Sequence, residues 1–259
     1  MANNLNVDED DKYKAPALDK GLDILETLAD ANLGLTQSEL ARKLKRSVGE
    51  IFRMLMVLRK RNLIELDELS DRYFLTTKLF ELAHKTPIIK RLTSAATPIM
   101  QQFSVKCNQS IHLSVQSDKN ILIVGQVDNP GNNVFSIRIG ARTDIWKTSS
   151  GRLMLAFKKD DEIEAFLKES PHPDGQKFQD LIKHMQEIRQ SNCEISPSYV
   201  VKGITNISAP VFDHDGYAIA ALTIPYLERL TEQVSIPQCT KLLIEASQTL
   251  SKHIGGNEF

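Results

Sequence analysis

Two helix-start signals lie eleven residues apart near the N-terminus of this chain. Thr36-x-x-Glu39 and Ser47-x-x-Glu50 both match the capping box, in which a hydroxyl and a carboxylate three residues later satisfy the first free N–H groups of a helix. Apolar residues at helical spacing follow each box, so we expect two short helices within residues 37–62. So tight a connection between two short helices is typical of a helix-turn-helix.

The segments on either side extend this motif. Residues 17–31 carry leucines at helical spacing, which predicts an amphipathic helix before the pair. After the pair, residues 63–66 and 73–75 have the composition of short strands, and the polar segment 67–71 between them predicts a hairpin. Three helices followed by a hairpin is the order of a winged helix-turn-helix, in which the hairpin is the wing.

The distribution of charge points to a polyanionic partner. The whole chain is nearly neutral, with 32 Lys plus Arg against 33 Asp plus Glu, but residues 36–78 hold ten Lys or Arg against six acids. A basic segment inside a neutral chain fits a module that binds nucleic acid. The candidate DNA-binding residues are Lys43, Lys45, Arg46, Ser47, Gly49, Glu50, Arg53 and Arg72.

Each candidate has an expected role on double-stranded DNA. The second helix of the pair would lie in the major groove, where Arg53 can bind two acceptors of a guanine. Lys43, Lys45 and Arg46 would contact the phosphate backbone, and Arg72 on the wing would contact phosphate or the minor groove. Glu50 leaves two interpretations open: its carboxylate could accept a hydrogen bond from a cytosine amino group, or it could only complete the capping box.

The rest of the chain predicts a second domain. A helical connector is expected next, with one helix over residues 78–85, a break at Pro87 and a second helix over residues 88–107. From Ser110 the pattern changes to alternating strands around polar turns, which suggests an antiparallel sheet. The expected strands are 110–117, 120–128, 133–140, 207–213 and 217–224, and the expected helices are 151–157, 161–169, 180–191 and 237–253. The domain boundaries that follow are a disordered acidic tail at 1–14, a winged helix-turn-helix at 15–77, a linker helix at 78–98 and a second domain at 99–256.

Several functional classes are disfavoured by composition. The three cysteines are far apart and lack C-x-x-C spacing, which argues against a disulfide framework or a zinc site and favours the cytoplasm. No apolar run approaches the length of a membrane span, and the polar N-terminus does not resemble a signal peptide. We therefore expect no membrane association, no metal and no cofactor.

The order of the motifs resembles the IclR family of bacterial transcriptional regulators from about residue 17 to residue 253. The matching stretches are "LDKGLDILETLAD", "LTQSELARKL", "IFRMLMVLRKRNLI" followed by "RYFLTTKLFELA", "TSSGRLMLAF" and "GITNISAPVFDHDGYAIAALTI". The resemblance implies an α+β chain with an N-terminal winged helix-turn-helix, a linker helix and a C-terminal GAF-like effector domain with an antiparallel sheet. It also implies a homodimer, often paired into a homotetramer, that binds a double-stranded DNA operator under the control of a small organic acid effector.

The same resemblance places the effector-binding residues. Ser149, Ser150 and Gly151 would form a helix start whose free N–H groups suit a carboxylate. Asn206 and Thr223 would add polar contacts from the late strands, and Phe135 and Ile137 an apolar wall. The plainer alternative for the two serines is a helix cap without a ligand. Ser196 stands where relatives often carry an acid.

An enzyme is the alternative function, either a small-molecule-binding or hydrolytic domain of GAF-like fold with an accessory helical module. Ser149 or Ser150 with His112 and an acid could be imagined as a catalytic triad, but the chain has no G-x-S-x-G motif and its histidines are scattered. A metal site at Cys107 and His112 lacks further ligands at suitable spacing, and a histidine at the start of a strand is more often packed or hydrogen-bonded. We therefore expect a ligand-responsive transcription factor with no catalytic residues.

Overall fold

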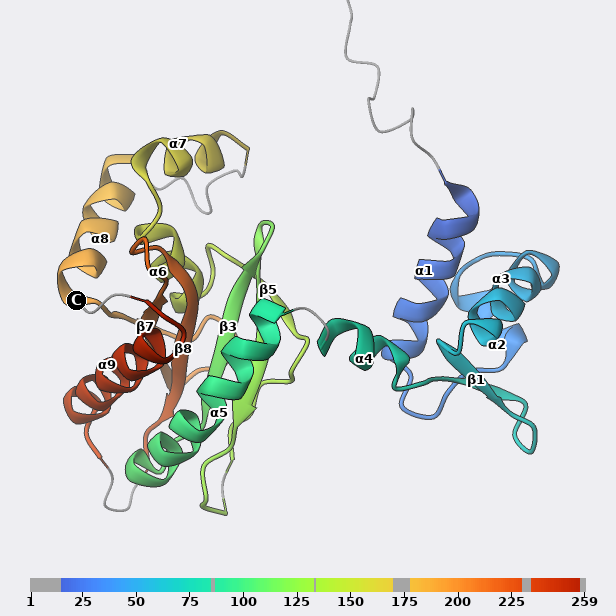
Figure 1. The fold of residues 1–259 in the computed structure, drawn as a ribbon, viewed down its shortest axis with the longest axis horizontal. Coiled ribbons are helices and arrows are strands. Elements are labelled where there is room, and N and C mark those ends of the chain that lie inside the picture. The colour runs from blue at the N-terminus through green and yellow to red at the C-terminus, as the bar shows by residue number, and fades with distance from the viewer. Residues whose placement is uncertain (1–14, 85–86, 133, 170–177, 230–233, 257–259) are drawn as a thin grey trace, which may run out of the picture. The chain divides into compact units, whose positions relative to one another are not determined.

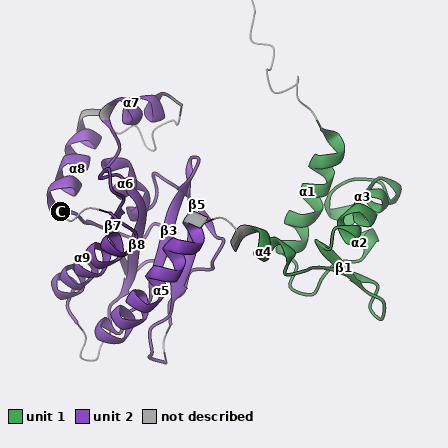
Figure 2. Cartoon of the chain, in the orientation of Figure 1, with its two compact units in different colours: residues 1–86 green, residues 87–259 purple. Residues whose placement is uncertain are grey.

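The computed structural model describes residues 15–84, 87–132, 134–169, 178–229 and 234–256, so the expected acidic tail at 1–14 lies outside the described residues. The chain divides into two compact units, residues 1–86 and residues 87–259 (Figure 2). No helix in the described ranges is long and apolar enough to cross a membrane.

Unit 1 has the predicted order of three helices and a hairpin, followed by a fourth helix. Its elements are α1 (Pro16–Ala29), α2 (Gln37–Lys43), α3 (Val48–Lys60), β1 (Ile64–Asp67), β2 (Arg72–Leu75) and α4 (Lys78–His84). Both capping boxes are formed. In each, the hydroxyl of Thr36 or Ser47 accepts a hydrogen bond from the N–H of the glutamate three residues later, and the side chain of that glutamate accepts one from the N–H of Thr36 or Ser47. Lys45, in the turn between α2 and α3, has a φ of 52°, a left-handed conformation that allows the chain to reverse in three residues.

The core of unit 1 explains why the short helices are stable. Leu28 of α1, Leu40 of α2, Leu55 of α3 and Tyr73 of the wing are all buried in one cluster. Helices this short are marginal alone, so packing of their apolar faces supplies the stability. The wing is joined to this core by an antiparallel bridge between Leu35 and Tyr73.

Unit 2 is built on a six-stranded antiparallel sheet with the strand order β5-β4-β3-β8-β7-β6. The strands are β3 (Ile111–Ser117), β4 (Asn120–Val127), β5 (Arg142–Asp144), β6 (Glu194–Pro197), β7 (Ile204–Phe212) and β8 (Ala218–Leu227). The helices are α5 (Pro87–Cys107), α6 (Ser149–Ala156), α7 (Asp160–Glu169), α8 (Phe178–Ser191) and α9 (Ile236–His253).

The two faces of this sheet have different partners. One face packs against α5 and α9, which lie side by side (Figure 1), and strand residues such as Leu113, Ile207 and Leu222 point into that core. The other face packs against α6, which is backed by α8. Because side chains alternate along a strand, His112 and Thr223, the neighbours of Leu113 and Leu222, lie on the α6 side of the sheet.

The structure differs from expectation in two places. The strand expected at 133–140 is absent from the described part of that range, and β5 is a short strand further on. The alternation there has another cause, because Phe135 and Ile137 line a cavity instead of joining the sheet. The edge strand β6 was not expected. The connector over 78–98 consists of the two expected helices, α4 in unit 1 and the first half of α5 in unit 2, where Leu92 and Ala96 are buried in the core.

Candidate functional site: an exposed helix and an enclosed cavity

The third helix presents a polar face to solvent. Ile51, Leu55 and Leu58 of α3 are buried, whereas Ser47, Gly49, Glu50 and Arg53 are exposed. The side chains of the exposed cations Lys43, Lys45 and Arg53 make no hydrogen bond or ion pair with any residue that the structure describes. These three side chains are therefore available to a polyanion.

Glu50 is engaged inside the domain. Its Oε2 accepts hydrogen bonds from the N–H and the hydroxyl of Ser47 at 3.0 and 2.9 Å, and its Oε1 lies 2.8 Å from the Lys20 ammonium on α1. The Lys20 contact, followed by the bonds from Ser47, lowers the pKa of the Glu50 carboxyl to about 2. Both oxygens have partners, which supports the capping interpretation over reading of a cytosine.

Two of the candidate arginines also have partners within unit 1. Arg46 donates to Asp23 of α1 at 2.7 Å. Arg72 donates to both carboxylate oxygens of Glu39, at 2.9 and 3.2 Å, and to the Gly34 carbonyl at 2.9 Å. These contacts hold the helix pair against α1 and the wing against α2, which is a different role from the DNA contact expected for either arginine.

Unit 2 contains a cavity of about 330 Å³ between the sheet and the start of α6. Six of the seven expected effector-binding residues line it: Phe135, Ile137, Ser149, Ser150, Asn206 and Thr223. Sequence reasoning did not select its other polar walls, which include His112, Arg138, Tyr199 and Thr148. The family resemblance therefore identified six of the residues that line the cavity, and the structure adds the others.

Gly151 does not line the cavity and serves the backbone instead. A Cβ atom at this position would lie 1.9 Å from the carbonyl oxygen of Ile145, so any side chain would collide with the main chain. The N–H of Gly151 donates to the Thr148 hydroxyl at 3.1 Å, which caps α6. Gly151 thus lets the helix begin close to the preceding loop, and this places Ser149 and Ser150 against the sheet.

A row of hydroxyl groups runs beneath the cavity. The Ser149 and Ser208 hydroxyl oxygens are 2.8 Å apart, and those of Ser208 and Thr223 are also 2.8 Å apart. All three side chains are buried. Ser208 was missed by the sequence analysis, although its place two residues after Asn206 puts it on the same face of β7.

His112 was weighed as a member of a triad or a metal site, and a packed or hydrogen-bonded histidine was the favoured interpretation. It is 4% exposed, as a packed histidine would be, but its Nδ1 has no hydrogen-bond partner among the described residues. Burial lowers the pKa of its ring to about 4, so His112 is neutral at pH 7. The available signal was the alternation of side chains along the strand. Leu113 points into the core at α5 and α9, so His112 points to the other side of the sheet, where the cavity lies.

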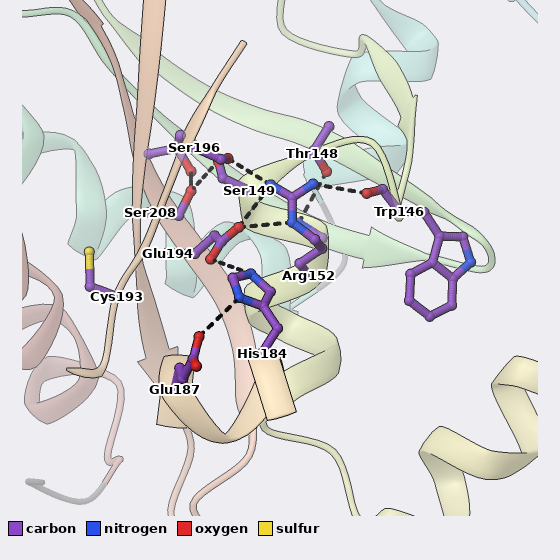
Figure 3. Close-up of polar contacts among 12 residues, drawn as sticks. Trp146, Thr148, Ser149, Arg152, His184, Glu187, Cys193, Glu194, Ser196 and Ser208 are labelled. Carbon is purple, nitrogen blue, oxygen red and sulfur yellow. Dashed lines mark hydrogen bonds and ion pairs between the residues drawn. The ribbon is translucent and has the colours of Figure 1, made fainter. Parts of the chain in front are cut away.

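A second, more polar cavity of about 640 Å³ adjoins the other side of Arg152. Arg152 donates from Nε to Glu194 at 2.8 Å, from Nη1 to the Trp146 carbonyl at 3.0 Å and from Nη2 to the Ser196 hydroxyl at 2.6 Å (Figure 3). Glu194 is 3% exposed, and its other oxygen lies 3.0 Å from Nε2 of His184 on α8. Arg152 is therefore committed to a buried ion pair and not to the first cavity.

The arrangement does not suit nucleophilic catalysis. The Ser149 hydroxyl is bonded to Ser208, and Nδ1 of His112 has no partner to orient the ring. Within the described ranges, no group of three or more His, Cys, Asp or Glu side chains could hold a metal ion.

Comparison with known proteins agrees with both units. Residues 17–68 match the model of the IclR helix-turn-helix domain, and residues 83–252 match that of the bacterial transcriptional regulator IclR C-terminal domain. The chain is 24% identical to the HTH-type transcriptional regulator KdgR of Escherichia coli, over 91% of each chain.

Solved structures share the fold. The chain is similar to the IclR protein of Thermotoga maritima, with a TM-score of 0.73, 22% identity, and coverage of 92% of this chain and 98% of that one. It is also similar to an IclR homologue from Microbacterium hydrocarbonoxydans in complex with 4-hydroxybenzoate, with a TM-score of 0.78, 20% identity and the same coverage.

Proposed function

Because the chain belongs to the IclR family of bacterial transcriptional regulators, we propose that a small organic acid bound in the 330 Å³ cavity controls its affinity for an operator. Membership makes the protein a DNA-binding transcriptional regulator with a C-terminal effector-binding domain, and not an enzyme. The class of effector and the residues that contact it and the DNA are the proposal.

The charge of the cavity wall supports the proposal that the effector is an acid. Among the described residues that line it there is no Asp or Glu, and the one cation is Arg138. Arg138 is exposed and makes no side-chain hydrogen bond or ion pair with the residues described. The start of α6 adds N–H groups that favour an anion. A wall with one cation and several hydroxyls suits a monoacid better than a phosphate ester.

Two further observations support this class. The Asn206 side chain can donate and accept, so it can bind a carboxylate or a hydroxyl. The homologue from Microbacterium hydrocarbonoxydans was solved with 4-hydroxybenzoate, which is an acid of this size class.

The experiment is a thermal-shift screen of the full chain against organic acids, followed by calorimetry on the best acid. A ligand that binds only the folded state raises the unfolding temperature. The variant Ser150→Leu should fill the cavity and abolish binding. Ser94→Leu, an exposed position on α5, is the matched control and should bind as the wild type does. Unchanged affinity in Ser150→Leu would mean that the serines are only a helix cap.

For DNA, we propose that Arg53 reads a base and that Lys43 and Lys45 contact phosphate, while Arg46, Glu50 and Arg72 act mainly by holding unit 1 together. Arg53→Ala should cost about 1–3 kcal/mol on the operator and relax one base position. Lys45→Ala should weaken binding to all sequences alike and reduce the salt dependence. Equal losses on operator and random DNA for Arg53→Ala would remove it from base reading.

We also propose assembly into a homodimer or homotetramer. Leu18 and Leu22 of α1 and Leu82 of α4 are exposed leucines, and we propose that α1 and α4 meet a second copy through them. A dimer would place two α3 helices about 34–36 Å apart, or at a multiple of this spacing, on a palindromic site. A monomeric particle in light scattering at micromolar concentration, with and without DNA, would contradict the assembly.

A further inference from the structure

His112 is a buried polar residue whose ring has an unpaired nitrogen in unit 2. Its side chain faces the cavity, it is 4% exposed, and Nδ1 has no hydrogen-bond partner among the described residues. Buried polar atoms in proteins nearly always have partners, because an unpaired one costs stability. A histidine at this position of the cavity wall thus carries a cost in the protein alone.

The surroundings of His112 keep its ring uncharged. It lies opposite Thr223 in the pairing of β3 with β8, and Thr223 belongs to the row of neutral hydroxyls with Ser208 and Ser149. No carboxylate lines the cavity within the described residues, and burial lowers the pKa of the ring to about 4. A neutral imidazole offers one donor and one acceptor and does not attract a carboxylate by charge.

Arg138 gives another part of the cavity wall a different character. Its guanidinium is a cation, it is exposed, and no carboxylate that the structure describes pairs with it. The cavity wall therefore has an exposed cation that attracts an anion and a buried imidazole that offers neutral hydrogen bonds.

We propose that His112 selects the effector by binding an uncharged hydroxyl or carbonyl oxygen of an acid whose carboxylate lies toward Arg138. This inference rests on the proposed function, because it names the chemical class that the same cavity accepts. The effector is then a hydroxy or keto monoacid. Its plain analogue lacks the oxygen that the imidazole would bond and binds more weakly.

The test compares acids that differ by one oxygen. Calorimetry measures the affinity of the full chain for 4-hydroxybenzoate against benzoate and for lactate against propionate. In at least one pair the wild type should prefer the oxygenated acid by roughly tenfold or more, since a site built to bond a hydroxyl rejects the analogue without one. In His112→Phe the preference should fall to within about twofold, mainly through weaker binding of the oxygenated acid.

Two further variants separate recognition from folding. His112→Gln keeps hydrogen-bonding groups, so it should retain part of the preference and serves if the phenylalanine variant does not fold. His214→Gln changes an exposed histidine of the β7–β8 hairpin and should leave both affinities unchanged. The unfolding temperature of ligand-free His112→Phe should equal or exceed that of the wild type, a result that a histidine needed for packing would not give.

The possible results separate the role of His112 from the existence of the acid site. A preference of undiminished size in His112→Phe, or equal affinity of the wild type for both members of every pair that binds, overturns the role of His112 and leaves the acid site standing. Binding of no acid by the wild type, either in these pairs or in the thermal-shift screen, overturns this inference together with the proposal of a small organic acid.

Discussion

Arg152→Met should be among the most destabilising single changes in unit 2. Arg152 donates from Nε to Oε1 of Glu194 at 2.8 Å, its Nη2 lies 2.8 Å from the same oxygen in the ion pair, and Glu194 is 3% exposed. The substitution leaves Oε1 without a donor and leaves the buried charge with only His184. Breaking a buried pair by removal of one partner costs about 3–5 kcal/mol. The 20% exposure of the Arg152 side chain places our expectation near the lower value, about 3 kcal/mol.

The double variant Arg152→Met/Glu194→Leu distinguishes an unpaired charge from a loss of packing. Replacement of a whole buried pair by apolar residues is often close to neutral, so the double variant should recover at least about 2 kcal/mol. Urea unfolding followed by fluorescence measures this directly, because Trp146 is the chain's single tryptophan and is buried in unit 2. A double variant as unstable as Arg152→Met, or a single cost below about 1 kcal/mol, would refute the reasoning.

Two further predictions concern local structure. Gly151→Ala should destabilise unit 2 by about 1–3 kcal/mol and weaken acid binding, since the Cβ would meet the carbonyl of Ile145; Gly49→Ala, which meets nothing within 4 Å inside α3, should instead stabilise unit 1 by about 0.5–1 kcal/mol in thermal unfolding. The pKa of Glu50 lies below its ordinary value of 4.5, so its contribution is complete above pH 4.5 and is lost as the pH falls toward 2. Glu50→Gln should therefore make the unfolding free energy of unit 1 depend less on pH between 4.5 and 2. An unchanged pH dependence would remove Glu50 from that role.

The elements of unit 1 could be predicted from sequence because their signals are local. The capping boxes at Thr36 and Ser47 and the helical spacing of apolar residues fix where each helix starts and which face it buries. The ion pairs Arg46–Asp23 and Arg72–Glu39 join residues 23 and 33 positions apart. Nothing in a local pattern specifies such a pairing, so arginines that stabilise the domain were indistinguishable from arginines that bind DNA.

In unit 2 the sequence pattern was misleading where a strand and a cavity wall look alike. Phe135 and Ile137 alternate with polar residues, as they would in a strand, but their apolar side chains line the cavity. His112 was hard to assign for a different reason. It is isolated in sequence, and no local pattern indicated that the pairing of β3 with β8 would bring Thr223 next to it or that Ser149 of α6 would line the same cavity. The effector residues were placed by resemblance to a family, and the fold then showed which of them share one cavity.

The measurement that bears most directly on the account is DNA binding with and without the acid. An operator selected from random DNA is titrated by fluorescence anisotropy with the full-length wild type and with Ser150→Leu. Coupling between two sites requires that the ligand have different affinity for the DNA-bound and free proteins, and typical values are about 5–150-fold. We predict a change of at least about fivefold in the operator affinity of the wild type and none in Ser150→Leu. The same change in both proteins, or a wild type that binds the acid without any change in operator affinity, would contradict the account.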